Sequence, residues 1–368
     1  MCSQSEKLKA WRYLPEAQSI TEEAGKSLSR YLSVANNEKP AKFMIARKLP
    51  AQFDKNDSIE DLWKEHDVLT RKFCELESAV DQGKMIFQNM PTPVKTYLDL
   101  KIEIAENILQ SCHLCTRRCG VNRLGEHLGY CRCGSEMQVS SIFAHLGEEP
   151  ELVPSGTVFT MGCTIRCKHC QNWTISQWEE AGATFGPEEL ARKVEQLRLN
   201  GCRNINLVGG EPTCWMPQWL NVFKHVDVNV PIVWNSNAYY SNETARLLAG
   251  FADVYLLDFK YGAENCAARI SDAPHYWEVC TRNHLDADKY GELIVRILVL
   301  PGHLGCCTRP TFDWIVSNLG KSTRINVMLQ YRPEWRASEV PELRKKLTKA
   351  EIVKVHRLAE DVGLRNVV

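Results

Sequence analysis

From Gly156 onwards the sequence alternates about six times between short apolar runs and longer amphipathic stretches. The apolar runs are typical of buried strands, and they comprise residues 157–161, 204–208, 232–235, 254–258, 293–300 and 325–329. The stretches between them favour helices near residues 187–199, 216–225, 242–249, 276–284 and 310–318. Strands that alternate with helices form a parallel sheet with right-handed crossovers. The sequence therefore predicts an α/β barrel-like domain of six strand–helix units at residues 151–340.

Two helical segments are expected to flank this domain. Residues 1–110 carry no chemical motif, but Ser58 precedes a run of apolar residues at helical spacing, and a second helix is expected from Val94 to about residue 109. We interpret this extension as packed on the barrel, with a partner-docking arm as the alternative. His66 is expected to be a packed histidine and Cys74 a buried thiol. Residues 341–368 open with a capping box at 348–351 and predict a helix on the barrel's flank.

Three cysteines follow the first strand of the barrel at C-x3-C-x2-C spacing: Cys163, Cys167 and Cys170. Gly162 lets the backbone turn tightly into this loop. Three thiolates on one short loop can converge on a metal centre. Zinc usually takes four protein ligands, or three and a water, whereas a four-iron cluster held by three cysteines keeps one iron free of protein ligands. A zinc loop and buried thiols are the alternatives to such a cluster.

Polar residues also follow the other strands, which are otherwise apolar. In barrels of this type, functional groups gather at the carboxyl ends of the strands. These ends are Gly209-Gly210-Glu211-Pro212, Asn235-Ser236-Asn237, Asp258-Phe259-Lys260, Pro301-Gly302-His303 and Gln330-Tyr331-Arg332, with Arg296 inside the fifth strand. Such a pattern indicates a ligand cavity, although ordinary solvated strand ends remain the alternative.

A second group of cysteines lies in residues 111–150, which we interpret as a metal-binding segment and a connector. Cys112, Cys115 and Cys119 are followed by Cys131 and Cys133 within a glycine-rich stretch that is too short to build its own core. Structural zinc, a second iron–sulfur cluster and unmetallated thiols all fit this spacing, because zinc and iron–sulfur centres both take four thiolates. In the connector, residues 137–143 favour a strand, and His145, Glu148 and Glu149 are expected on a surface turn, with cavity lining as the alternative.

The remaining cysteines give weaker signals. Cys306 and Cys307 are adjacent beyond the fifth strand, where they could donate a hydrogen atom, form a redox pair or be placed by chance. The others have no partner spacing and are expected to be packed thiols: Cys202, Cys214, Cys266 and Cys280.

Composition narrows the classes of partner and compartment. Lys plus Arg equals Asp plus Glu at 45 each, so no bulk charge favours nucleic acid or an anionic membrane. No apolar run approaches the roughly 20 residues of a membrane span, and the first residues lack the apolar core of a signal peptide. Sixteen cysteines without such a signal favour metal ligation in a reducing cytoplasm over disulfides.

Over residues 111–335 the sequence resembles the radical S-adenosylmethionine (SAM) superfamily, and within it the branch similar to pyruvate formate-lyase activating enzyme. The resemblance is carried by the cysteine loop, by Gly-Gly-Glu-Pro, and by the motifs C-x-L-C-x3-C-G-V-N-R, C-Q-N-W, V-W-N-S-N-A-Y and L-L-D-F-K. It implies a partial (β/α)6 TIM-like barrel with a helical extension and a cysteine-rich insert. It also implies that Cys163, Cys167 and Cys170 are the catalytic cysteines that hold a [4Fe-4S] cluster, whose fourth iron binds SAM.

In this family an electron from the cluster cleaves SAM to methionine and a 5'-deoxyadenosyl radical, which abstracts hydrogen from a substrate. The residues that the resemblance implies for cofactor binding are His169, where many members have an aromatic residue against adenine, Asn172, Gly209, Gly210, Glu211, Asn235, Ser236, Asp258, Lys260, Arg296 and Gln330. The cysteines that match the family's upstream pattern are Cys112, Cys115, Cys119 and Cys131, with zinc or a second cluster as the expected metal.

The resemblance further implies an electron donor such as flavodoxin or ferredoxin, and a protein or peptide target of the glycyl-radical kind. A small-molecule rearrangement or a methyl transfer is the nearest enzymatic alternative. A non-catalytic metal-binding protein is the alternative of another class, but such a scaffold has no need of the polar residues at Gly209-Gly210-Glu211 or Asp258-Phe259-Lys260.

Overall fold

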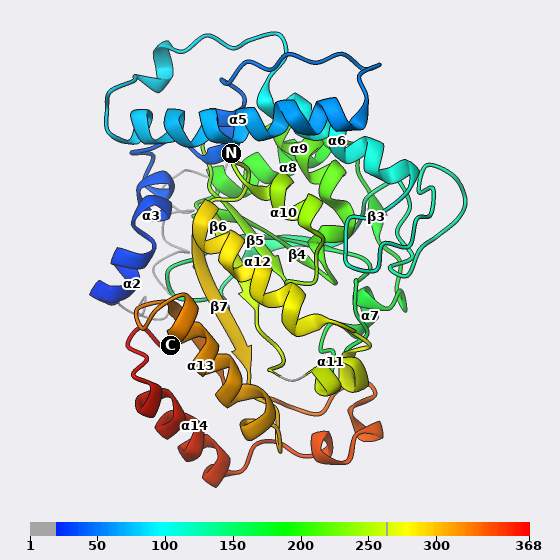
Figure 1. The fold of residues 1–368 in the computed structure, drawn as a ribbon, viewed down its shortest axis with the longest axis vertical. Coiled ribbons are helices and arrows are strands. Elements are labelled where there is room, and N and C mark those ends of the chain that lie inside the picture. The colour runs from blue at the N-terminus through cyan, green and yellow to red at the C-terminus, as the bar shows by residue number, and fades with distance from the viewer. Residues whose placement is uncertain (1–19, 263) are drawn as a thin grey trace, which may run out of the picture.

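A mostly parallel, eight-stranded sheet forms the centre of the molecule (Figure 1). The computed structural model describes residues 20–262 and 264–368, so the first 19 residues of the predicted extension lie outside the described part. The strand order is β3-β1-β2-β4-β5-β6-β7-β8. The strands are β1 (Gln138–His145), β2 (Ser155–Thr160), β3 (Ala183–Thr184), β4 (Asn204–Gly209), β5 (Ile232–Ser236), β6 (Val254–Asp258), β7 (Glu292–Leu298) and β8 (Arg324–Met328).

Six consecutive strands, from β2 through β4 to β8, are parallel, and each pairs with the next. The sheet does not close on itself, because β3 and β8 form its two edges. This arrangement confirms the predicted α/β fold and its open barrel of six strand–helix units. The residues of β5 are buried throughout, as expected for a strand covered on both faces.

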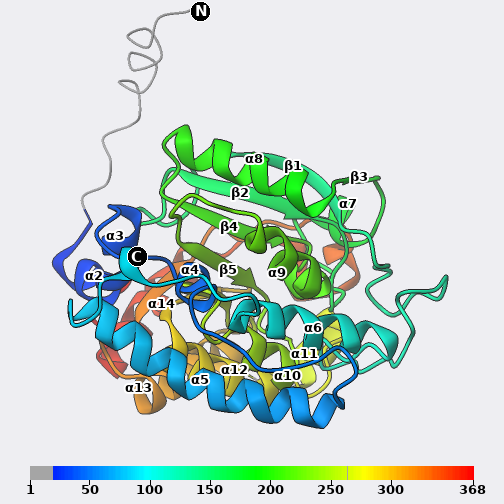
Figure 2. The same cartoon turned by 90° about the horizontal axis from the view of Figure 1, so that it is seen from above.

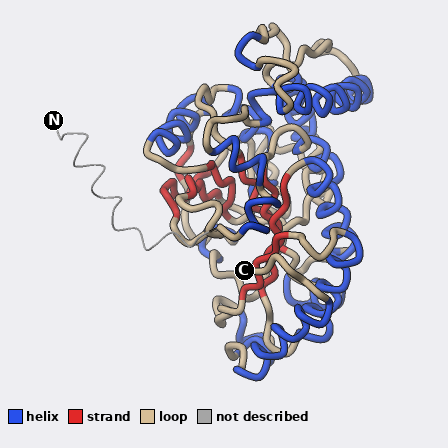
Figure 3. The backbone as a smooth tube through the Cα atoms, turned by 90° about the vertical axis from the view of Figure 1, so that its left-hand side faces the viewer, coloured by secondary structure: helices blue, strands red, loops and turns tan. Residues whose placement is uncertain are grey.

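Helices surround the sheet in the view from above (Figure 2) and along the side seen in Figure 3. Those of the barrel are α7 (Trp173–Ser176), α8 (Pro187–Leu199), α9 (Met216–Lys224), α10 (Asn242–Leu248), α11 (Glu264–Ser271), α12 (Tyr276–Tyr290) and α13 (Arg309–Asn318). A π-helix, η4 (Leu304–Thr308), precedes α13, and short 3-10 turns are η2 (Phe87–Asn89), η3 (Pro212–Trp215), η5 (Ala337–Glu339) and η6 (Pro341–Arg344).

The segment before the cysteines is helical, as predicted, with α2 (Glu22–Ser27), α3 (Ser29–Ala35), α4 (Lys42–Ala46), α5 (Ile59–Asp81) and α6 (Tyr97–Gln110). Ser58 caps α5 by accepting a hydrogen bond from the Asp61 N–H. Helix α6 starts later than predicted, because Thr96 and Asp99 form a capping box that leaves Val94 outside the helix and exposed.

One side chain of α5 confirms the prediction and one contradicts it. His66 is buried, as expected, and burial lowers its pKa to about 3, so the ring is neutral. Cys74 is exposed rather than buried, because it follows Phe73 by one residue and a helix turns by about 100° per residue, which takes it off the buried stripe.

The N-terminal helices share their apolar cores with the barrel: α4 to α6 pack into the main core, and Tyr31 of α3 packs into a second cluster with residues of β5, β6 and β7. The ring of Phe43 on α4 lies 5.1 Å from that of Phe223 on α9, in an edge-to-face contact. The ring of Phe73 lies against Gly250, where an added Cβ would come within 3.2 Å of the ring. Polar contacts continue the interface, because Arg30 forms an ion pair with the buried Asp253 at 3.2 Å.

Helix α14 (Lys349–Val362) has the predicted capping box, in which Thr348 and Glu351 exchange hydrogen bonds, and Gly363 ends it at a φ of 77°. The chain then returns to the edge of the sheet. The N–H of Ile325 in β8 donates to the carbonyl of Asn366, and the N–H of Val368 donates to the carbonyl of Ile325, both at 2.9 Å. This pairing covers the edge of β8, which would otherwise offer free backbone groups. Among the described residues, every helix is too short or too polar to span a membrane.

Candidate active site

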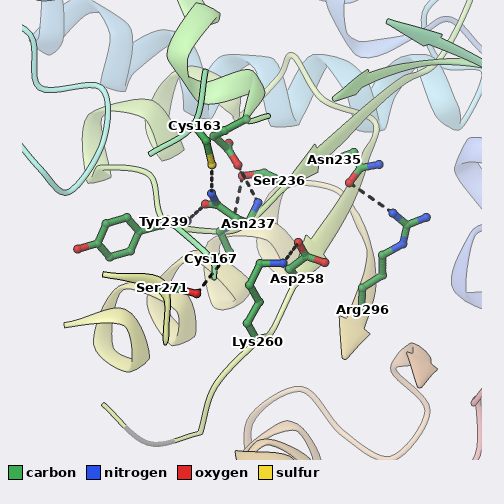
Figure 4. Close-up of polar contacts among 12 residues, drawn as sticks. Cys163, Cys167, Asn235, Ser236, Asn237, Tyr239, Asp258, Lys260, Ser271 and Arg296 are labelled. Atoms are coloured by element: carbon green, nitrogen blue, oxygen red, sulfur yellow. Dashed lines mark hydrogen bonds and ion pairs between the residues drawn. The ribbon is translucent and has the colours of Figure 1, made fainter. Parts of the chain in front are cut away.

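A cavity of about 390 Å³ opens at the carboxyl ends of the parallel strands. The residues that line it include all those predicted to hold the cluster or SAM: Cys163, Cys167, Cys170, His169, Asn172, Gly209, Gly210, Glu211, Asn235, Ser236, Asp258, Lys260, Arg296 and Gln330. Parallel strands carry their carboxyl ends to the same side of a sheet, so residues far apart in the sequence meet here. Figure 4 shows the polar contacts among several of them.

The cysteine loop is held in place by its backbone. Gly162 has a φ of 83°, which a residue with a side chain rarely adopts. The N–H groups of Arg166 and Lys168 donate to carbonyls of α11, those of Ser271 (2.8 Å) and Ile270 (2.9 Å). The loop is therefore fixed between the end of β2 and the end of α11.

Each of the three thiols of the loop has a polar partner. The side-chain amide of Asn237 donates to Cys163 Sγ at 3.5 Å, and the Ser271 hydroxyl donates to Cys167 Sγ at 2.9 Å (Figure 4). Cys170 Sγ lies 3.3 Å from the hydroxyl of Ser176. Donors to the sulfurs of an iron–sulfur centre tune its reduction potential.

Burial raises the pKa of all three thiols. The pKa of Cys163 is raised well above its usual value, and that of Cys170 is also raised. Burial raises the pKa of Cys167 to about 11, although the positive charge of Lys260 opposes the shift. The free thiols are therefore protonated at neutral pH, and a metal that binds them must displace protons.

Glu211 joins the ends of β4 and β5. It is buried, and one carboxylate oxygen accepts hydrogen bonds from the hydroxyls of Thr213 (2.5 Å) and Ser236 (2.7 Å). The other oxygen accepts from the Asn237 N–H at 2.8 Å. Burial raises the pKa of Glu211, against these hydrogen bonds. Because Asn237 in turn contacts Cys163, Glu211 helps to position a donor to the cysteine loop.

A partly buried ion pair lies beside the loop. Lys260 Nζ lies 2.6 Å from Asp258 Oδ2 at the end of β6. Burial lowers the pKa of Lys260, but the charges of Asp258 and Cys167 and the hydrogen bond to Asp258 together outweigh this effect and raise the pKa above its usual value, so the ammonium keeps its proton. The cavity thus holds a protonated ammonium beside the cysteine loop, already paired with one carboxylate.

Arg296 enters the cavity from β7 and binds two carboxylates of the β1–β2 connection. Its Nε lies 2.7 Å from Glu149 Oε1, and its guanidinium also contacts Glu148 and lies 3.5 Å from the amide oxygen of Asn235. His145 and Glu148 line the cavity and Glu149 is buried. The prediction of a surface turn for these three residues is therefore wrong.

His169 occupies the position where many family members have an aromatic residue. It is buried, and burial lowers its pKa to about 3, so the imidazole is neutral. Its Nε2 lies 3.2 Å from the hydroxyl of Tyr261, which lies 2.6 Å from Ser271 Oγ. A chain of hydrogen bonds thus links the cavity wall to Cys167, and Tyr261 and Ser271 carry no sequence signal for this role.

The second cysteine group also comes together. Cys112, Cys115, Cys119 and Cys131 line one small pocket beside the buried Arg123. Cys214 lines it too, and the sulfur atoms of Cys131, Cys133 and Cys214 lie within 4.8 Å of one another. Cys214 is buried, as predicted for a packed thiol, but it also lies among other thiols. The sequence did not indicate this grouping of thiols, because Cys214 is about 80 residues from Cys133.

Four further ligand-type residues meet elsewhere. The side-chain atoms of Cys266, His303, Cys306 and Cys307 lie within 4.8 Å of one another. Cys266 is buried, as predicted for a packed thiol, but the sequence did not indicate the three ligand-type residues beside it. Cys202 and Cys280 are buried, as predicted.

Comparisons with known proteins agree with this geometry. Residues 157–315 match the family model of the radical SAM superfamily. The chain belongs to this superfamily, whose members use an iron–sulfur cluster together with SAM.

Among curated proteins, the chain is similar to the uncharacterized protein MJ0674 of Methanocaldococcus jannaschii. The two are 41% identical over 343 residues, which cover 92% of this chain and 98% of the archaeal protein. MJ0808 of the same archaeon is 26% identical over 286 residues, which cover 70% of this chain and 79% of that protein.

Among solved structures, SuiB of Streptococcus suis bound to S-adenosylmethionine is similar, with a TM-score of 0.43 and 14% identity. The match covers 54% of this chain and 44% of SuiB, so the chain spans less than half of that protein's length.

Proposed function

We propose that the chain is a radical SAM enzyme in which Cys163, Cys167 and Cys170 hold a [4Fe-4S] cluster and the surrounding strand ends bind SAM. The observation that supports this proposal most is the convergence of three thiols, the ammonium of Lys260 and the polar strand ends on one cavity. Its volume lies within the range of about 300–1,000 Å³ that is common for small-molecule sites.

The thiols of the loop fit a cluster of several irons better than a single ion. Ligands of one tetrahedral ion crowd together, as the sulfurs of Cys131, Cys133 and Cys214 do. Cys163, Cys167 and Cys170 are not among the described groups whose ligand atoms lie within 4.8 Å of one another. In a cubane each cysteine binds a different iron atom, so its sulfurs need not converge.

When bound, the reduced cluster would supply the electron that cleaves SAM to methionine and a 5'-deoxyadenosyl radical, which takes a hydrogen atom from the substrate. The chain's own residues would bind SAM and orient it beside the cluster. Gly210 lies so close to the cysteine loop that an added Cβ would come within 2.0 Å of the Gly162 carbonyl oxygen. Lys260 supplies positive charge beside Cys167, and the neutral His169 offers a ring face to adenine.

The test is anaerobic reconstitution with iron and sulfide, followed by addition of dithionite and SAM. We expect a [4Fe-4S] spectrum and formation of 5'-deoxyadenosine. Cys163→Ala, Cys167→Ala and Cys170→Ala should each abolish the product, whereas Cys202→Ala, which removes a buried thiol far from the cavity, should retain it. Product formation by the three loop variants would refute the assignment.

We further propose that Cys112, Cys115, Cys119 and Cys131 hold a second metal, either zinc or an iron–sulfur cluster. These four are not one of the described groups whose ligand atoms all lie within 4.8 Å of one another, so the measure applied to the loop favours the cluster here too. Their shared pocket beside Arg123 supports this, because a fixed cation stabilises thiolates. Cys115→Ala should lower thermal stability and remove metal from this pocket, as measured by elemental analysis, while the loop cluster still assembles. Complete loss of SAM cleavage in a folded Cys115→Ala protein would contradict a purely structural role.

A protein or peptide substrate is our proposal for the target, with flavodoxin or ferredoxin as the electron donor; the sequence motifs shared with the activating enzymes support both. Cell extract separated by size provides the test. Stimulation of 5'-deoxyadenosine formation by the high-mass fraction, lost after protease treatment, would support a protein target. Stimulation by the low-mass fraction alone would instead favour the small-molecule alternative.

A further inference from the structure

We propose that Cys266, His303, Cys306 and Cys307 form a closed, four-ligand site for a thiophilic divalent cation of the zinc type. Cys266 comes from α11, and the other three come from the segment that joins β7 to α13. None of the four lines the proposed SAM cavity. The site is therefore separate from both cysteine groups described above.

The distances between the ligand atoms match one tetrahedral ion. Zinc–sulfur bonds of about 2.3 Å and zinc–nitrogen bonds of about 2.0–2.1 Å place sulfurs about 3.8 Å apart and sulfur about 3.5 Å from nitrogen at the tetrahedral angle. Cys306 Sγ lies 3.7 Å from Cys266 Sγ and 3.9 Å from Cys307 Sγ. His303 Nδ1 lies 3.4 Å from the first two of these sulfurs and 3.9 Å from the third.

The local backbone brings three of the ligands to the same side. Residues 304–308 form a π-helix, in which the carbonyl of His303 accepts from the N–H of Thr308 at 3.3 Å and from that of Cys307 at 2.9 Å. Single π-helical turns are uncommon and often occur at functional sites. Cys306 and Cys307 follow His303 by three and four residues, and side chains at these two spacings lie next to the first residue on one side of a helical turn.

The histidine is also oriented as a metal ligand. Its Nδ1 faces the three sulfurs, while its Nε2 lies 3.3 Å from Glu342 Oε1. Glu342 is itself paired with Arg269 at 2.5 Å. A carboxylate behind the second ring nitrogen is the usual partner of a metal-bound histidine, because it fixes the tautomer that leaves the other nitrogen free to bind.

A disulfide explains this cluster less well. The sulfurs of Cys266 and Cys306 are 3.7 Å apart and those of Cys306 and Cys307 are 3.9 Å apart, whereas a disulfide needs about 2.05 Å. A disulfide would also leave the oriented histidine without a role. Four protein ligands leave no open coordination position, which is the arrangement of structural sites rather than catalytic ones. The ion would tie α11 to the segment after β7. Because α11 also carries Ser271, the donor to Cys167, it would stiffen the wall of the SAM cavity.

Cys306 provides a residue-resolved test, because it is exposed while the other three ligands are buried. The full-length, anaerobically purified protein is kept reduced and treated with N-ethylmaleimide after exposure to EDTA or to Zn²⁺ alone. Mass spectrometry then measures alkylation of Cys306. We expect zinc to slow this alkylation at least tenfold. Cys74, which is exposed and outside every ligand group, serves as the internal control and should react equally in both samples.

His303→Asn and Cys307→Ser should each remove the protection of Cys306 and one equivalent of zinc per chain, without changing the iron content. Equal alkylation of wild-type Cys306 with and without zinc would overturn the proposal, and this comparison holds even if a variant fails to fold. Protection that exists only before reduction would indicate a disulfide and would also overturn it. Cys163→Ala should keep the zinc protection, so this test is independent of SAM cleavage.

Discussion

Replacing Arg296 with methionine would remove the cation from a buried cluster of two carboxylates. Side-chain exposure in this cluster is 14% for Arg296, 6% for Glu148 and 0% for Glu149. After the replacement, Glu149 would keep its hydrogen bond from Asn326 at 2.8 Å, and Glu148 would keep His145 at 3.3 Å. Neither contact replaces the guanidinium, which bridges both carboxylates.

The expected cost follows from this geometry. Removing one partner of a buried ion pair costs about 3–5 kcal/mol, because a buried charge is left without compensation. At about 2.1 cal/mol/K per residue, unfolding of the 368-residue chain carries an entropy of about 0.8 kcal/mol/K. Arg296→Met should therefore lower Tm by about 4–6 °C at pH 7. The Tm of Arg296→Lys should lie between that of Arg296→Met and that of the wild type, because lysine keeps the charge but cannot contact both carboxylates in the same way.

The pH dependence gives a second, independent check. Burial raises the pKa of Glu148, but His145 and Arg296 outweigh it and hold the pKa at about 2. A carboxyl with a lowered pKa stabilises the fold above its unfolded pKa of about 4.5, and this contribution is lost as the pH falls toward 2. In Arg296→Met the carboxylate of Glu148 should take up a proton more readily, so the loss of Tm relative to the wild type should shrink from pH 7 to pH 5. Circular dichroism melts of anaerobic protein measure this, and a deficit that is constant or grows toward pH 5 would refute the reasoning.

Three further variants test other parts of the structure. Burial raises the pKa of Glu292 to about 7, so the stability from its protonated form is full below about pH 4.5 and is lost as the pH rises through 7. Relative to Glu292→Gln, the free energy of unfolding of the wild type should fall by at most about 3 kcal/mol between pH 4.5 and 8. Melting experiments at several pH values measure this, and parallel pH profiles of the two proteins would contradict it. Gly210→Ala should lower 5'-deoxyadenosine formation about 100-fold, because its Cβ would collide with the cysteine loop. Gly186→Ala, where a Cβ meets nothing within 4 Å, is the matched control and should keep its activity. Ser271→Ala removes the hydroxyl that donates to Cys167 and should make the cluster potential more negative in an EPR-monitored redox titration; an unchanged potential would exclude this tuning role.

The strands and the cavity could be predicted from sequence for a simple physical reason. Strands buried on both faces must be apolar, so β5 and β6 stand out as short runs, and polar residues such as Asp258 then mark their ends. Parallel topology brings those ends together without further information. The start of α6 was missed because Pro93 suggested a helix start, whereas the capping box at Thr96 provides two hydrogen bonds.

Features that depend on distant partners could not be predicted. In sequence, the turn that contains Glu149 resembles a solvated loop, because its partner Arg296 lies 147 residues away in the chain. Cys266 and His303 are 37 residues apart in the chain. Their spacing resembles no common zinc motif, and only the packing of α11 against the segment after β7 brings Cys266 to the other three residues. Sequence patterns report what neighbouring residues can do, and these groups are assembled by tertiary packing.

The apolar contact between α4 and α9 limits how this protein can be cut into fragments for experiments. A fragment that began at Cys112 would leave the ring of Phe223, which packs on Phe251, facing water where Phe43 now covers it. Such fragments should associate with one another or be degraded, whatever their metal content. Chimeras that exchange the catalytic half of the molecule should therefore carry the leading helices with it.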